Sequence, residues 1–182
     1  MTAKLATLFV LLALSAQGAF AAEVGRKNLG VFNDVSNTVN RYERFTIFDD
    51  VSAAVKDGVV TLSGKVTMPY KKADIEKRVA KVDGVTQVID HIAVLPVSHW
   101  DDQLRYRIAR AIYGNGNFSN LAIMANPPIH IVVENGRVTL TGVVQSEVDR
   151  ALARSLASGR GEFSVKNELK TEEEVRATLE KL

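Results

Sequence analysis

The sequence predicts an α+β protein made of two small tandem domains, each with the order helix, strand, strand, helix, strand (αββαβ). The main observation is a repeat, because residues 58–66 (GVVTLSGKV) return 78 positions later as residues 136–144 (GRVTLTGVV). Alternating apolar residues precede both phrases at the same offset: Val51, Ala53 and Val55, then Ile129, Ile131 and Val133. One unit is therefore written twice, and we expect each copy to form a three-stranded mixed sheet packed against two helices.

The first two strands of each copy are joined by a tight hairpin. Asp57-Gly58 and Asn135-Gly136 stand between alternating apolar runs, which is the pattern of a two-residue turn with positive φ. A helix then leads to the last strand, so we expect a right-handed crossover between parallel strands. We interpret the glycines at matched places in the two copies as structural: Gly58, Gly64, Gly84, Gly136, Gly142 and Gly161.

Amphipathic helices are expected to cover one face of each sheet. Ser98 and Ser146 begin capping boxes in the second copy, and Pro69 lies near the start of a helix in the first copy. A further helix is expected over residues 33–42. The predicted inward stripes are Val35, Val39 and Tyr42; Ile75, Val79 and Val82; Leu104, Ile108 and Ile112; and Val148, Leu152 and Leu156.

The two ends of the chain lie outside the repeated units. Residues 1–21 have the pattern of an export signal, with Lys4, an apolar run over residues 5–14 and a small-residue cleavage site at Ala19-Phe20-Ala21. Retention as a membrane anchor is the alternative, but ten apolar residues are fewer than the ~20 that a spanning helix needs. Residues 171–182 have a Thr-x-x-Glu cap and are expected to form a short docking helix with an apolar stripe of Val175, Leu179 and Leu182.

These boundaries place the first domain at residues 28–95 and the second at residues 96–170. The chain has no cysteine, so neither a lipid-attachment thiol nor a disulfide framework is present. Its formal net charge is +2, which argues against the strong uniform field of a nucleic-acid-binding protein. After removal of the signal we expect an exported, periplasmic protein with no integral membrane span.

The phrase Val-x-Asp-Gly-Val-Val-Thr-Leu-Ser-Gly-x-Val, a helix, and then Gly-Val-x-x-Val-x-Asp-x-Ile resembles the BON domain (bacterial OsmY and nodulation). The likeness covers residues 28–95 and 98–170. Asn167 matches the polar position that the family usually has in its last strand, whereas Asp90 departs from it mildly, and Gly161-Glu162-Phe163 replaces the usual Gly-Val. The resemblance implies a bacterial envelope protein linked to osmotic stress or outer-membrane integrity. It also implies binding of phospholipid surfaces or envelope proteins without catalysis.

The residues themselves offer little for catalysis, a metal or a cofactor, and we predict none of these. The pairs Asp49-Asp50 and Asp101-Asp102 are best explained by local structure, the second by a helix first turn that favours negative charge. His91, His99 and His130 are the only histidines and lack metal-ligand spacing, so we interpret them as solvated or hydrogen-bonded, with His130 on the outward face of its strand. Asp90 and Asn167 lie in the inward register, where we expect them to tie down a loop backbone.

The copies differ most between their first helix and first strand. Eight residues separate Tyr42 from Val51, whereas fifteen separate Tyr113 from Ile129. The longer loop contains Phe118, Leu121, Ile123 and Met124. These apolar residues either pack against their own domain or are displayed to a partner.

The helix before this loop has an aromatic and basic face. A step of about 100° per residue places Tyr106, Arg110 and Tyr113 opposite the inward stripe, with Arg105 at its edge. Trp100 either serves the same surface or staples the first turn. Arginine beside tyrosine suits anionic phospholipid headgroups, and a solvated basic face is the alternative. The candidate surface for an anionic phospholipid or an envelope protein comprises Trp100, Arg105, Tyr106, Arg110, Tyr113, Phe118, Leu121 and Met124.

Overall fold

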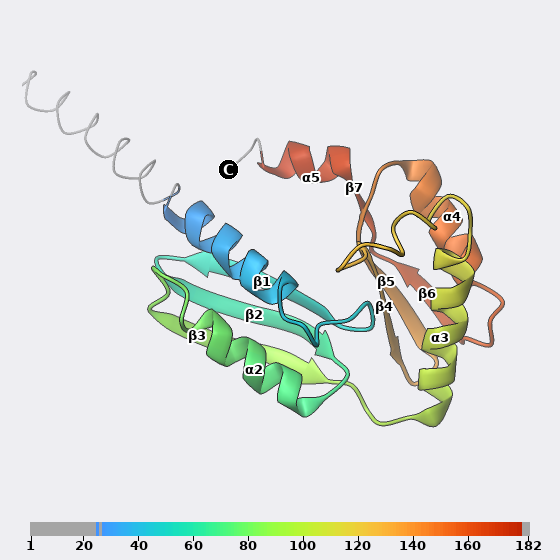
Figure 1. Cartoon of the computed structure of the whole chain (residues 1–182), viewed down its shortest axis with the longest axis horizontal. Coiled ribbons are helices and arrows are strands. Elements are labelled where there is room, and N and C mark those ends of the chain that lie inside the picture. Colours follow the sequence, from blue (N-terminus) through green and yellow to red (C-terminus); the bar gives the residue numbers. More distant parts are fainter. Residues whose placement is uncertain (1–24, 26, 180–182) are drawn as a thin grey trace, which may run out of the picture.

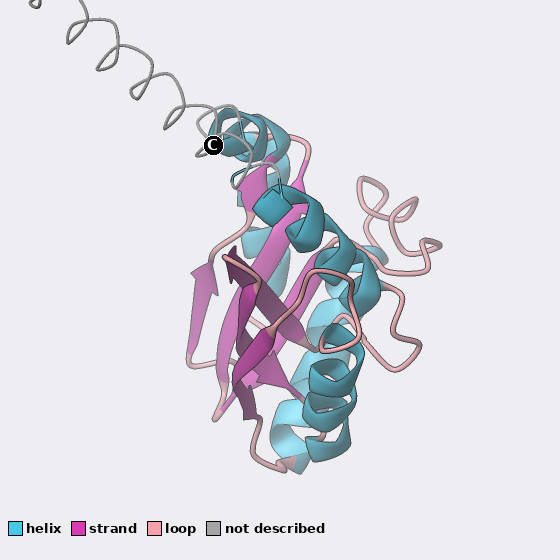
Figure 2. Ribbon diagram, turned by 90° about the vertical axis from the view of Figure 1, so that its left-hand side faces the viewer, coloured by secondary structure: helices cyan, strands magenta, loops and turns pink. Residues whose placement is uncertain are grey.

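A computed structural model describes residue 25 and residues 27–179 of the chain. The expected export signal, Leu182 and the side chain of Leu179 lie outside what it describes. Within the described part, two sheets each carry helices on one face, which confirms the predicted α+β class (Figure 1). Figure 2 shows the first domain nearest the viewer, with its strands on the left and its helices on the right.

The first domain begins with a helix over residues 27–40, called here the N-terminal helix. It continues with β1 (Asp50–Lys56), β2 (Val59–Val66), α2 (Pro69–Val79) and β3 (Gln87–Val94). The β1 and β2 strands are antiparallel and β2 and β3 are parallel, as the hairpin and the crossover predict. The N-terminal helix starts earlier than expected, because Val31 packs on the core and the Asn28 side chain accepts a hydrogen bond from the Asp57 N–H.

The second domain repeats this order and adds a short strand and a helix at its end. Its elements are α3 (His99–Tyr113), β4 (Ile129–Glu134), β5 (Arg137–Val144), α4 (Glu147–Ala157), β6 (Ser164–Asn167), β7 (Lys170–Thr171) and α5 (Glu172–Leu179). Both β6 and β7 lie parallel to β5, so the last strand of the repeat is interrupted in this copy. The strand register is nevertheless shared, since Leu62 faces Asp90 in the first sheet and Leu140 faces Asn167 in the second.

Each hairpin makes the predicted positive-φ turn, with φ of 51° at both Asp57 and Asn135. The second repeated glycine has a different role. A Cβ atom at Gly64 would lie 2.1 Å from the carbonyl oxygen of Asp50, and one at Gly142 would lie 1.9 Å from that of Pro128. Both glycines also have positive φ, so no other residue fits where the neighbouring backbone crosses this strand.

The predicted stripes of the N-terminal helix, α2 and α3 pack in the two cores, whereas that of α4 does so only in part. There Val148 is 72% exposed, and the inward positions are taken by Ala153 and Ala157. Leu152 and Leu156 are only partly buried and lie on the flank of the core. The prediction that Val148, Leu152 and Leu156 form the inward stripe is therefore wrong for Val148 and holds only at the edge of the core for Leu152 and Leu156. Because α4 packs directly on α3, small side chains occupy the positions that face the core.

The two domains contact each other through the segment before β1. These residues, 46–49, lie beside β4, the edge strand of the second sheet (Figure 1). The Ile131 N–H donates to the Ile47 carbonyl at 2.6 Å, and Ile47 and Phe48 pack against the core of the second domain. His130 is buried against this segment, with Nδ1 2.6 Å from the Asp49 carbonyl. First-domain residues thus cover the free edge of the second sheet.

The α5 helix follows directly on β7 and begins with the predicted cap. The Glu174 N–H donates to the Thr171 hydroxyl, and the Thr171 N–H donates to the Glu174 carboxylate. Glu174 also pairs with Arg150 of α4, which holds α5 to the second domain. No helix in the described part of the chain is long and apolar enough to span a membrane.

Candidate functional site

The exposed face of α3 carries three of the predicted surface residues. The Ser98 side chain accepts a hydrogen bond from the Asp101 N–H and starts the helix, which then presents Trp100 and Tyr106 to solvent. Trp100 is 51% exposed and Tyr106 is 63% exposed, and Arg110 is also exposed. The Tyr106 ring makes a T-shaped contact with the Phe48 ring of the first domain, so this face borders the domain junction.

Arg105 does not belong to this face. Its side chain is 4% exposed, donates to the Val133 carbonyl at 2.7 Å and pairs with Asp102. The guanidinium therefore ties α3 to β4, with its aliphatic stem packed inside the domain. The expectation that Arg105 contributes to an outward basic surface is wrong, because its guanidinium reaches the Val133 carbonyl of β4.

Arg107 is the surface cation that the sequence analysis missed. It is exposed, and its guanidinium lies 5.1 Å from the centroid of the Trp100 ring. The signal was present, because residues seven apart lie on the same side of a helix. Among the described residues, neither Arg107 nor Arg110 has an acidic partner within ion-pairing distance, so both charges are available to a ligand.

In the longer loop after α3, the first part packs against the second-domain core and the second part is exposed to solvent. Phe118 is buried in the second-domain core and Leu121 is partly buried against it. Ile123 is 87% exposed and Met124 is half exposed. The two expected alternatives therefore each hold for part of the loop, and Phe118 and Leu121 are not available as a partner surface.

Tyr113, the last predicted member of the surface, is also turned inward at its hydroxyl. The hydroxyl donates to the Ile129 carbonyl at 2.6 Å and accepts from the Ile129 N–H at 3.1 Å. Burial raises the pKa of the Tyr113 phenol, and the hydrogen bond that its oxygen accepts from the Ile129 N–H opposes this only in part. Tyr113 therefore anchors the end of α3 to the start of β4.

The polar residues that interrupt the apolar pattern serve the backbone. Asp101 is buried and accepts hydrogen bonds from the Asn135 and Gly136 N–H groups, so it caps the second hairpin from α3. Asn167 donates to the Arg150 carbonyl and accepts from the Leu169 N–H. In the first domain, the Asp90 carboxylate makes the equivalent contact and accepts a hydrogen bond from the Ile92 N–H. These contacts agree with the structural interpretation of all three residues.

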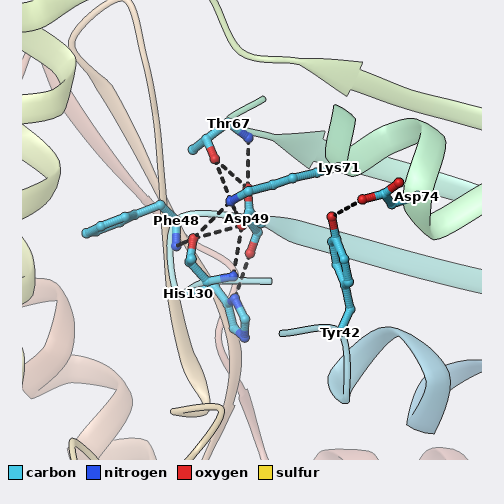
Figure 3. Close-up of polar contacts among 8 residues, drawn as sticks. Tyr42, Phe48, Asp49, Thr67, Lys71, Asp74 and His130 are labelled. Carbon is cyan, nitrogen blue, oxygen red and sulfur yellow. Dashed lines mark hydrogen bonds and ion pairs between the residues drawn. The ribbon is translucent and has the colours of Figure 1, made fainter. Parts of the chain in front are cut away.

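A buried polar cluster lies at the domain junction (Figure 3). The Asp49 carboxylate accepts hydrogen bonds from the backbone N–H and hydroxyl of both Thr46 and Thr67, and it pairs with Lys71 at 2.6 Å. Burial alone would raise the pKa of Asp49, but the hydrogen bonds and charge of Lys71, together with the threonine donors, lower it. The cluster thus holds the junction segment in the conformation that meets His130.

Replacing His130 by alanine should loosen the two domains without unfolding either one. The change removes the hydrogen bond to the Asp49 carbonyl and the contact with the Phe45 ring, whose centroid lies 5.5 Å from the imidazole centroid. We expect a stability loss of about 1–3 kcal/mol and greater independent tumbling of the domains in NMR relaxation. Unchanged tumbling in the variant would contradict this role. An His91→Ala variant is the control, since His91 is exposed on β3.

Two clefts in the described part of the chain are open and polar, and neither encloses a set of reactive groups. They lie beside α2 and α5. Within residues 27–179, no group of three or more His, Asp or Glu side chains is placed to hold a metal ion. The arrangement is therefore suited to binding by charged and aromatic surfaces.

Comparison with known proteins identifies the repeated unit. The family model of the BON domain matches residues 35–96 and again residues 101–178. No curated protein matches the chain. Among solved structures, the chain is similar to CdsD, a structural protein of the type III secretion system of Chlamydia trachomatis, with 14% identity and a TM-score of 0.30, over 81% of this chain and 96% of that one. A C-terminal domain structure of CdsD gives 16% identity and a TM-score of 0.29, over 67% of this chain and 56% of that one.

The two matched segments correspond to the two copies of the αββαβ unit seen in the structure. BON-domain proteins are generally associated with the bacterial envelope, bind phospholipids or proteins, and are generally not enzymes. The chain belongs to this family and carries two BON domains in tandem.

Proposed function

We propose that the protein is a non-catalytic, exported protein that binds anionic phospholipid surfaces in the bacterial envelope through the exposed face of α3. The observation that carries the proposal is a cluster of exposed side chains on this face, in which Arg107 lies against the Trp100 ring and Arg110 follows on the same helix. Tyr106 extends the cluster towards the first domain. A periplasmic role in envelope integrity or osmotic stress follows from this activity, as the family resemblance implies.

The chemistry of this cluster, called here the α3 surface, suits a headgroup layer. Tryptophan and tyrosine are enriched at membrane interfaces, where an apolar ring and a polar edge are both satisfied. Each arginine near an anionic surface contributes about 1 kcal/mol of attraction, which falls off within a Debye length. Contact between the Arg107 guanidinium and the Trp100 ring keeps the cation beside the aromatic anchor.

The protein should therefore bind vesicles that contain phosphatidylglycerol and bind phosphatidylcholine vesicles much less. Trp100 is the only tryptophan in the chain, so its fluorescence reports directly on burial of the α3 surface. The double variant Arg107→Glu/Arg110→Glu should weaken binding at least about tenfold, because two attractions become repulsions. Titration with vesicles, followed by fluorescence and by co-sedimentation, measures both effects.

The matched control is Arg154→Glu/Arg176→Glu, which makes the same change of charge at exposed positions on α4 and α5. Equal binding to neutral and anionic vesicles would refute the proposal, as would an equal loss in both double variants. Rising salt should weaken the binding of the unmodified protein.

A second candidate is a protein-interaction module acting through the displayed end of the longer loop. The observation in its favour is the exposure of Ile123 and Met124 on a well-packed base. Substitution of both residues by serine should then abolish cross-linking to an envelope partner while leaving vesicle binding unchanged. A protein that stays monomeric and retrieves no partner would count against this candidate.

A further inference from the structure

A second binding site is suggested by an open groove in the first domain, away from the α3 surface. The groove has a volume of about 800 Å³ and lies between the N-terminal helix and α2. Its walls carry four cationic side chains, Arg41, Lys77, Arg78 and Lys81, together with the carboxylates of Asp34, Asp74 and Asp83. All of these residues lie outside the repeated segments, residues 58–66 and 136–144.

The two copies of the domain differ at this place in a specific way. Counted from the aligned helix starts at Pro69 and Glu147, Asp74 corresponds to Leu152 and Arg78 corresponds to Leu156. Leu152 and Leu156 are partly buried and pack against the core of the second domain. In the first domain the same flank of the helix carries opposite charges and lines the groove. At these matched positions the second domain therefore has apolar side chains that cover its core, whereas the first domain has charged side chains that line a groove.

The buried positions of the two helices differ in the opposite sense. Ile75 and Val79 in α2 are replaced by Ala153 and Ala157 in α4, and all four are buried. The alanines let α4 pack directly on α3. The larger side chains of α2 pack in the first-domain core with Val35 and Val39 of the N-terminal helix, and the groove lies between the same two helices.

One wall of the groove is held in a defined geometry. The Tyr42 hydroxyl donates to the Asp74 carboxylate at 2.6 Å, and the Arg78 guanidinium lies 4.8 Å from the centroid of the Tyr42 ring (Figure 3 shows the tyrosine and the aspartate). Burial and the Asp74 carboxylate raise the pKa of Tyr42 to about 12, so the hydroxyl remains a donor at neutral pH. The Arg78 guanidinium is thus held by the Tyr42 ring and makes no ion pair with the Asp74 carboxylate, so its N–H groups can donate to a ligand.

The other cations of the groove are also uncommitted. Within the described part of the chain, the side chains of Arg41, Lys77 and Lys81 have no hydrogen-bond or ion-pair partner. Cations gathered around one groove without contacting carboxylates attract an anion, and a phosphate ester matches the forked donors of arginine. Among the described residues, the carboxylates of Asp34 and Asp83 also have no hydrogen-bond or ion-pair partner. Two unpaired carboxylates in the groove favour the binding of an ammonium group.

We infer that this groove binds a small zwitterion that carries a phosphate ester and a primary ammonium group. The phosphate contacts Arg41, Arg78 and the two lysines, and the ammonium contacts Asp34 or Asp83. A phosphoethanolamine group has this chemistry, whether it belongs to a lipid headgroup or to a free glycerophosphodiester. The site is independent of the α3 surface, which recognises net negative charge.

The test is an NMR titration of the intact two-domain protein with glycerophosphoethanolamine. At about 10 mM ligand we expect saturable amide shifts confined to residues 34–41 and 74–83. Glycerophosphocholine should shift the same amides several-fold less, because its quaternary ammonium donates no hydrogen bond to a carboxylate. To identify the source, vesicles with and without phosphatidylethanolamine in a phosphatidylcholine background are added as competitors. Displacement by the first kind alone assigns the lipid headgroup, and no displacement by either assigns the free diester.

Two double variants test whether the groove side chains bind the ligand. Asp74→Leu/Arg78→Leu installs the residues that α4 carries at these positions and should abolish the shifts. Lys77→Glu/Lys81→Glu changes only exposed positions and should weaken the binding at least about tenfold. The control Arg176→Leu on α5 should leave it unchanged. Absence of shifts in the groove, or equal shifts with inorganic phosphate or with glycerophosphocholine, would overturn the inference. Binding that survives Arg107→Glu/Arg110→Glu separates this site from the α3 surface.

Discussion

Replacing Asp49 by alanine should lower the free energy of unfolding by about 3–5 kcal/mol. The carboxylate is fully buried and accepts hydrogen bonds from Thr46, Thr67 and Lys71. Its removal leaves the Lys71 ammonium buried without a counter-charge and two backbone N–H groups without an acceptor, which costs more than the lost contacts alone. Urea unfolding of the intact protein at pH 7 measures the loss.

Lys71→Met should cost less than Asp49→Ala, because four donors from Thr46 and Thr67 still satisfy the Asp49 carboxylate. Asp50→Ala is the matched control, since this neighbouring carboxylate has no side-chain partner in the described residues. A loss below about 1 kcal/mol for Asp49→Ala would show that water reaches the cluster.

The effect of Asp49→Ala should also depend on pH. The pKa of Asp49 is lowered from its ordinary value of 3.8, so the ionised carboxylate stabilises the folded state fully above that pH. This contribution is lost as the pH falls through the lower folded-state pKa. The difference between the unmodified protein and the variant should therefore narrow below pH 3.8, and a difference that stayed constant down to strong acid would exclude the ion pair as its source.

Replacing Gly142 by alanine should destabilise the second domain by about 3 kcal/mol or more. The new Cβ atom would lie 1.9 Å from the Pro128 carbonyl oxygen, and the residue has φ of 109°, which strains any L side chain. Because the obstacle is backbone, no side-chain rotation relieves the contact. Thermal unfolding followed by circular dichroism measures the loss.

Gly116→Ala is the control for this substitution, because nothing lies within 4 Å of a Cβ atom there and φ is not positive. We expect a change within about 0.5 kcal/mol at Gly116. The Gly64→Ala variant should repeat the Gly142 result in the first domain, where the Asp50 carbonyl oxygen would lie 2.1 Å away. A mild effect at both repeated glycines would mean that β1 and β4 shift easily at this crossing.

The local features of the fold were predictable because they depend on neighbouring residues. The Asn135-Gly136 turn, the Ser98 and Ser146 caps and the parallel crossover follow from turn chemistry, capping and period. The α4 stripe was predicted one position away from the buried one. Periodicity favours the large apolar Leu152, whereas the tight packing of α4 on α3 favours Ala153.

The candidate surface was only partly predictable for the same reason. Trp100, Tyr106 and Arg110 lie on the exposed face as their spacing indicates. Arg105 differs from Arg107 by only two positions, yet it is buried because the Val133 carbonyl lies within reach of its guanidinium. Helical periodicity cannot anticipate a hydrogen bond to a strand 28 residues away.

The sequence by itself determined the doubled αββαβ unit, its hairpins and glycines, and the family to which the chain belongs. The tertiary structure decided which charges face solvent, how residues 46–49 cover the edge of β4, and where a polar groove opens beside α2. The physical reason is the range of the interactions. Turns and caps are made within a few residues, whereas burial, ion pairing and groove formation depend on side chains brought together from distant parts of the chain.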